Sequence, residues 1–166
     1  MPGNNVNLIP VQAGGNFSQW DMSLNGGGSN GPNSYPQIPV TGTNSTITFT
    51  IVNPKGIQFD TANPIYVKAG TAKPGTALDS QFTAAVTADQ HGNPNAVLTV
   101  TDSNTTAGSY AYVLNFQNNI PQVDPIMNNG GPGGRNYDYI WYAVGAVALI
   151  VILVLILRPM FNKQRQ

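Results

Sequence analysis

Residues 46–51 read TITFTI, and this stretch decides the fold class of the chain. Successive side chains of a β-strand point to opposite faces, so Ile47, Phe49 and Ile51 would share one face and the threonines the other. β-Branched and aromatic residues are also the types that strands favour. The stretch therefore predicts a strand with one face in an apolar core and one face in water.

Further stretches of strand character follow it, at residues 65–68 (IYVK), 81–87 (QFTAAVT), 97–101 (VLTVT) and 109–116 (SYAYVLNF). Turn-forming sequences separate them, at residues 53–56 (NPKG), 73–75 (KPG) and 91–94 (HGNP). The chain has no Glu, and Lys and Leu are scarce before residue 140, which disfavours helices. Residues 38–128 are therefore expected to form a mainly β module, a sandwich of two antiparallel sheets.

Residues 101–112 (TDSNTTAGSYAY) resemble the E–F corner of immunoglobulin-like domains, in which an Asp-containing loop leads to Tyr-x-Cys. By this resemblance Tyr110 is the corner tyrosine, with its hydroxyl bonded back to the loop, and Tyr112 stands at the cysteine position. The closing residues 123–129 (VDPIMNN) also resemble the ends of small bacterial and phage immunoglobulin-like modules. The resemblance implies an immunoglobulin-like antiparallel sandwich, although the chain has no cysteine for the antibody-type disulfide.

Residues 1–37 are rich in Gly and Asn, as in residues 25–33 (NGGGSNGPN). Such runs bury too little apolar surface to offset their backbone entropy, so this segment is expected to be a flexible arm. Two interpretations of its apolar residues stay open. They are incidental features of a disordered leader, or the arm becomes ordered when Phe17, Trp20 and Met22 dock into the pockets of a partner.

Residues 140–157 (IWYAVGAVALIVILVLIL) form an uncharged run of apolar and aromatic residues. A helix of this length, at about 1.5 Å per residue, spans roughly 27 Å, close to the thickness of the hydrocarbon core of a bilayer. The run predicts a transmembrane helix at residues 137–158 that anchors the chain by its C-terminal end. The Gly-rich residues 129–136 are expected to be a flexible hinge, and residues 159–166 a short basic tail.

Aromatic residues precede this run and basic residues follow it, an order typical of a membrane span. The residues expected at the membrane interface are Tyr137, Tyr139, Trp141 and Tyr142. The residues expected to face lipid phosphates or DNA are Arg158, Lys163 and Arg165. Residues 1–138 hold seven Asp against four basic residues, so the main body is not expected to bind nucleic acid.

Few residues are candidates for catalysis or metal binding. The only histidine, His91, lies in a turn sequence with no second His, Cys or Glu near it, and predicts no metal site. Asp102 and Asn104 lack the Gly and Glu of a calcium loop and are expected to stabilise a turn. The Gly-rich stretches contain no Lys-Ser/Thr and are therefore not phosphate-binding loops. The chain is therefore expected to be non-enzymatic, with no cofactor and no metal.

Two rules for membrane orientation conflict in this chain. The sequence does not open on a basic or apolar leader, which favours a tail-anchored protein whose module stays on the side of synthesis. The excess of Lys and Arg after the span favours the opposite, a cytoplasmic tail and an exported module. Both orientations stay open, and the first is preferred.

The first orientation resembles that of the small membrane-associated structural proteins of tailless icosahedral phages with an internal membrane. By this resemblance the chain, in multiple copies, tethers a protein assembly, a viral capsid, to a lipid bilayer, and its tail touches DNA or anionic lipid. The main alternative is an accessory subunit of a bacterial envelope or membrane complex with an exported immunoglobulin-like domain. A third hypothesis is a membrane-tethered enzyme, which would need a cleft with clustered ionisable groups.

Overall fold

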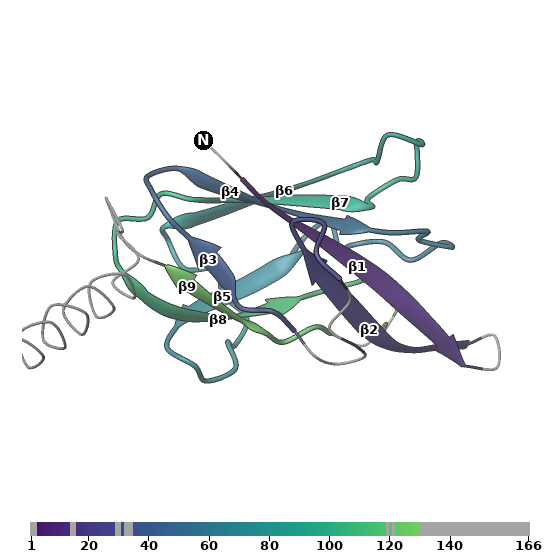
Figure 1. The fold of residues 1–166 in the computed structure, drawn as a ribbon, viewed down its shortest axis with the longest axis horizontal. Helices are drawn as coiled ribbons and strands as arrows, with labels where there is room; N and C mark the ends of the chain where they lie inside the picture. Colours follow the sequence, from purple (N-terminus) through teal and green to yellow (C-terminus); the bar gives the residue numbers. More distant parts are fainter. Residues whose placement is uncertain are drawn as a thin grey trace, which may run out of the picture. The chain divides into compact units, whose positions relative to one another are not determined.

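The computed structural model of the chain describes residues 3–13, 16–28, 31, 35–118, 120 and 122–129. In these residues the chain forms nine β-strands and no helix, so the fold is mainly β, as predicted (Figure 1). The expected hinge from residue 130 onward, the transmembrane helix and the basic tail lie outside the described residues. Within the described part, no helix has the length and apolar character needed to cross a bilayer.

The larger of two sheets contains the strand that decided the fold class. Its strands lie side by side in the order β2 (Asn16–Leu24), β1 (Asn4–Ala13), β4 (Ser45–Ile51), β7 (Val97–Asp102) and β6 (Phe82–Thr87). Neighbouring strands are antiparallel except for β1 and β4, which run parallel with Val6 opposite Phe49. The stretches predicted from the apolar pattern at residues 46–51, 81–87 and 97–101 are therefore strands of one sheet.

The smaller sheet also combines both strand directions. Its order is β3 (Ile38–Val40), β9 (Ile126–Asn129), β8 (Gly108–Leu114) and β5 (Ile65–Ala69). β3 runs parallel to β9, and the other pairs are antiparallel. Both sheets are mixed, which corrects the prediction of two antiparallel sheets. The alternation of apolar side chains indicates which face of a strand is buried, but it does not indicate the direction of the neighbouring strand.

Side chains from both sheets meet in one core. Alternate side chains of β4 are buried, as its sequence predicts. The ring of Phe49 in β4 lies 5.6 Å from that of Tyr112 in β8, and the ring of Phe82 in β6 lies 5.2 Å from that of Tyr110. Aromatic pairs of this kind add about 0.5–1.5 kcal/mol each beyond the burial of their apolar area. These contacts pack one sheet against the other.

Residues 4–24 form a hairpin that completes the larger sheet, so the prediction of a flexible arm over residues 1–37 is wrong for this part (Figure 1). β1 pairs with β2 on one side and with β4 on the other. Asn25 and Gly26, which follow β2, make a turn after the hairpin, with φ angles of 51° and 75°. Few residues other than Asn and Gly adopt this left-handed conformation readily.

The docking role predicted for the apolar residues of this segment also needs correction. Met22 is fully buried and Trp20 is 1% exposed. The Trp20 indole stacks on Phe116 with 4.5 Å between the ring centroids, and the half-buried Phe17 ring lies 5.0 Å from Trp20. Trp20 and Met22 fill the core of their own module because they alternate along β2, and they are therefore not available to the pockets of a partner.

The corner predicted at residues 101–112 is present. The hydroxyl of Tyr110 donates a hydrogen bond to the backbone oxygen of Thr106 at 3.2 Å, so the tyrosine closes the loop that leads into β8. Tyr112, at the position of the missing cysteine, is fully buried in the core. Burial raises its pKa well above the ordinary value for tyrosine, so its hydroxyl stays neutral at physiological pH.

We expect replacement of Trp20 to destabilise the whole module. The change Trp20→Ala removes the stacking partner of Phe116 and leaves a cavity in the core, which should lower the free energy of unfolding by about 3–5 kcal/mol. Chemical denaturation of the full chain, followed by tyrosine fluorescence, measures this loss. The control Thr46→Ala, at an exposed position of β4, should change stability by less than about 0.5 kcal/mol. Equal stability of the two variants would show that the hairpin does not belong to the folded core.

Candidate functional site

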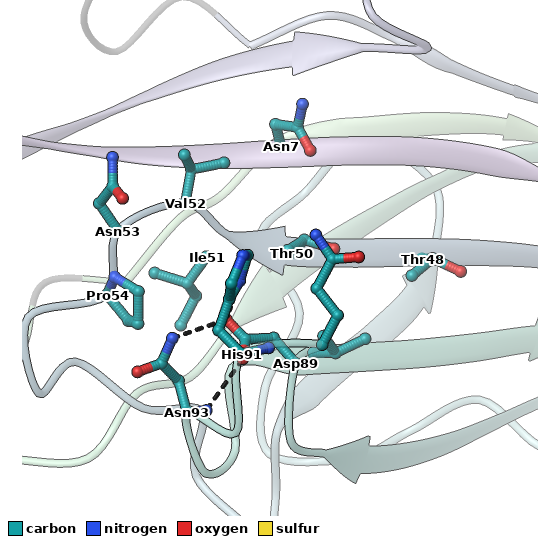
Figure 2. Close-up of a pocket in the computed structure, with 12 residues that line it drawn as sticks. Asn7, Thr48, Thr50, Ile51, Val52, Asn53, Pro54, Asp89, His91 and Asn93 are labelled. Atoms are coloured by element: carbon teal, nitrogen blue, oxygen red, sulfur yellow. Dashed lines mark hydrogen bonds and ion pairs between the residues drawn. The ribbon is translucent and has the colours of Figure 1, made fainter.

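A hollow with a volume of about 590 Å³ lies on the outer face of the larger sheet (Figure 2). The strands contribute Asn7 from β1 and Thr48 and Thr50 from β4. Ile51 at the end of β4, residues 52–54 after it, the loop between β6 and β7, and Val97 at the start of β7 supply the rest of its lining. The threonines are those of the TITFTI stretch, whose alternation turns them away from the core.

Asp89 organises the loop between β6 and β7. Its Oδ1 accepts hydrogen bonds from the backbone N–H groups of His91 at 2.8 Å and Asn93 at 2.9 Å, and its Oδ2 accepts one from the side-chain amide of Asn93 at 2.7 Å. These bonds favour the charged carboxylate, and the side-chain bond from Asn93 is the main reason that the pKa of Asp89 is lowered. Asp89 therefore holds the loop together.

His91, the only histidine, lies on the tip of this loop. Its side chain is 71% exposed, and its Nδ1 is 3.7 Å from Oδ2 of Asp89. Among the described residues, no three His, Cys, Asp or Glu side chains are grouped so that they could hold a metal ion. The position of His91 in an exposed turn agrees with the sequence interpretation.

The rest of the lining is uncharged and mixes polar with apolar side chains, the latter being Ile51, Val52, Pro54 and Val97. Asn7, Thr48 and Thr50 bring amide and hydroxyl groups to its surface (Figure 2), and Gln90 adds a further amide. Such groups donate and accept hydrogen bonds, but none of them is an acid or base that titrates near neutral pH. The lining of the hollow can therefore make both hydrogen bonds and apolar contacts with a partner.

We expect the loop at residues 89–93 to loosen in acid. Because the pKa of Asp89 is lowered in the folded chain, its charge stabilises the loop above the ordinary pKa of 3.8, and this contribution is lost as the pH falls through the lowered value. The backbone amide NMR signals of His91 and Asn93 should therefore shift together at a pH below 3.8. The variant Asp89→Asn should lack this transition, and a common midpoint above 3.8 would contradict the assignment.

A second polar cluster is buried where β7 and β9 end. Asp102 is fully buried, and its Oδ1 accepts the backbone N–H of Asn104 at 2.7 Å while its Oδ2 accepts the side-chain amide of Asn129 at 2.8 Å. Burial raises the pKa of Asp102, and the hydrogen bond from Asn104 opposes this rise only in part. The side-chain amide of Asn104 donates in turn to the backbone oxygen of Gly42. Asp102 thus stabilises a turn, as predicted, and ties that turn to the last strand.

Removing the Asp102 carboxylate should weaken the end of the module. The change Asp102→Ala leaves the buried N–H of Asn104 without its acceptor, which should lower the free energy of unfolding by about 1–3 kcal/mol. The isosteric change Asp102→Asn keeps an acceptor oxygen and should lose less than half as much. Denaturant titration of both variants measures the difference, and equal losses would show that the size of the side chain matters and its hydrogen bonds do not.

The structure does not bring the sequence-predicted site residues into one site. Trp20 and Met22 lie in the core, and Phe17 packs beside them. The residues predicted for the membrane interface and for contact with lipid or DNA lie outside the described residues. The hollow was not predicted, because its lining comes from strands and loops that are distant in the sequence.

Sequence comparison with known proteins identifies no relative of this chain. No protein-family model matches the sequence, and a search of curated proteins finds no match. A function for the chain must therefore be argued from its own residues.

Proposed function

We propose that this chain is a non-enzymatic structural membrane protein whose β module tethers a protein assembly to a lipid bilayer. The observation that carries the proposal is the uncharged apolar run at residues 140–157, with aromatic residues before it and basic residues after it. The run follows a folded module whose last strand ends at Asn129. The segment between them is Gly-rich and short, which would keep the module close to the lipid surface.

We interpret the module as an immunoglobulin-like sandwich in which β2 is added at the edge beside β1. In such domains strands A, B, E and D form one sheet, and strands C, F and G form the other. The order β1-β4-β7-β6 corresponds to A-B-E-D, and the order β9-β8-β5 corresponds to G-F-C. The hydrogen bond of Tyr110 at the corner before β8 supports the same interpretation. β1 departs from the pattern because it runs parallel to β4, and β2 extends the sheet beyond it.

The partner of the tether would contact the outer surfaces of the module, because Trp20 and Met22 belong to its core. The hollow on the larger sheet offers hydrogen-bonding groups for such a contact. We propose the capsid of a phage with an internal membrane as the assembly. The tail residues Arg158, Lys163 and Arg165 then contact DNA or anionic lipid, at about 1 kcal/mol each near an anionic surface.

An accessory subunit of a bacterial envelope or membrane complex is the second candidate. The observation that favours it is the excess of basic residues after residue 157, since Lys and Arg are retained in the cytoplasm. The module would then be exported and would bind neighbouring subunits. The two candidates differ in the side of the membrane on which the module lies.

Single-cysteine labelling would test the membrane anchor and its orientation. The chain has no cysteine, so Thr46→Cys reports on the module and Asn162→Cys on the tail. In intact cells that express the full chain, we expect both positions to be protected from an impermeant maleimide, with the tail alone reached from the outside once the outer membrane is opened. Alkaline carbonate should leave the chain in the membrane fraction.

The other outcomes discriminate between the proposals. Labelling of the module but not of the tail would favour the exported envelope subunit and would exclude the virion arrangement. Release of the chain by carbonate would show that residues 140–157 do not anchor it, and both forms of the tether would then fail.

A further inference from the structure

The two sheets have four edge strands, and three of these are protected against pairing with another strand. β3 carries Pro39, which lacks a backbone N–H. β5 is covered by the segment at residues 77–79, since the N–H of Val67 donates to Ala77 and its oxygen accepts the N–H of Asp79, both at 3.1 Å. β2 carries Asp21, a buried charged residue of the kind that discourages edge pairing.

The fourth edge, β6, has none of these devices. Residues 83–87 read TAAVT, without charge, proline or glycine. Thr83, Ala85 and Thr87 are exposed. Among the strands that the structure describes, β6 is the last of its sheet and pairs only with β7. Such a strand is open to a partner that continues the sheet.

The register with β7 shows which backbone groups of β6 are open. The N–H of Ser103 donates to the oxygen of Gln81 at 2.9 Å, immediately beyond the pair of Phe82 with Asp102. Hydrogen-bonded pairs alternate along an antiparallel ladder, so Thr83, Ala85 and Thr87 turn their backbone groups toward β7. Ala84 and Val86 turn theirs toward the open side. Within the described part of the chain, no backbone hydrogen bond reaches these two residues from that side.

The sequence of this edge is nearly symmetric about Ala85. If a second copy of β6 pairs antiparallel with the first around Ala85, Thr83 of each copy lies opposite Thr87 of the other. Ala84 then lies opposite Val86, so the four open N–H groups and the four open oxygens of these residues form four hydrogen bonds. Thr–Thr pairs across strands are favourable, and no charges oppose one another in this register.

From this geometry we infer that β6 is an interaction surface for a second copy of this chain, paired antiparallel about a two-fold axis at Ala85. The inference goes beyond the proposed tether and depends only on the described fold. Anchoring in a membrane would strengthen the pairing, because it confines the copies to a surface and raises their effective concentration.

Disulfide trapping in the cysteine-free chain tests this interface directly. In the proposed register the two Ala85 residues form a pair without hydrogen bonds, whose Cα atoms lie about 4.5 Å apart, within the range of a disulfide. The full chain with Ala85→Cys, in detergent solution and in phosphatidylcholine vesicles, should therefore become mostly disulfide-linked dimer on mild oxidation. The matched control Thr83→Cys should stay monomeric, because its two copies would lie about 13 Å apart.

A monomeric Ala85→Cys chain in both media would overturn the inference, and so would equal cross-linking of the two variants. Cross-linking in detergent alone would leave the interface standing while counting against the membrane anchor, so the two proposals fail separately.

Charge placement gives a second test that does not depend on cysteine. The double variant Thr83→Lys/Thr87→Lys sets like charges opposite each other across the axis, and should raise the dimer dissociation constant at least tenfold in sedimentation at low salt. The variant Thr83→Lys/Thr87→Asp changes the same two exposed positions but places opposite charges across from each other. It should dimerise at least as tightly as the natural chain. Equal dimerisation of the two double variants would overturn the proposed register.

Discussion

The parallel pairing of β1 with β4 is the contact on which the rest of the module depends. It brings the N-terminal hairpin onto the larger sheet and places Trp20 over Phe116. The pairing continues past the end of β4, where the N–H of Val52 donates to the oxygen of Leu8 at 2.8 Å. These residues are far apart in the sequence, so burial of the hairpin must offset the entropy of closing a long loop. Without the hairpin, the edge of β4 and a large apolar part of the core would face water.

The periodicity of the sequence predicted the strands whose inner face is strongly apolar, and the loop before Tyr110 predicted its corner hydrogen bond. The hairpin was missed because Asn and Gly were taken as signs of disorder. Several Asn residues of this chain instead take the left-handed conformation that is typical of turns. The Asn residues with positive φ are Asn25, Asn44, Asn53, Asn95, Asn104 and Asn118. The informative signal was the alternation of apolar residues along β1 and β2, which the flanking glycines obscured. The hollow could not be predicted, because it exists only once β1 lies beside β4.

The buried polar cluster around Asp102 would have a mechanical role if the chain is a tether. Asn129 is the last residue of β9, and in the sequence only a short segment separates it from the apolar run at residues 140–157. A load from a membrane anchor would therefore act first on β9. Its pairing with β3 and β8, together with the bond from Asn129 to Asp102, connects this strand to both sheets. Burying a carboxylate costs desolvation free energy, which a turn alone does not require. The cost is reasonable at a position where β9 must stay in register.

The contrast among the sheet edges bears on how copies of the chain would assemble. Few residues of the module are charged, so electrostatic repulsion between copies is weak. Three of the edges are instead protected against open-ended pairing by Pro39, by residues 77–79 and by Asp21. An antiparallel contact of β6 with β6 is isologous, so one pairing uses the open edge of both copies and the assembly closes at two. Any larger assembly must then be built through another surface. The outer face of the larger sheet is one candidate, because its hollow over β1 and β4 offers hydrogen-bonding groups that the β6 pairing does not use.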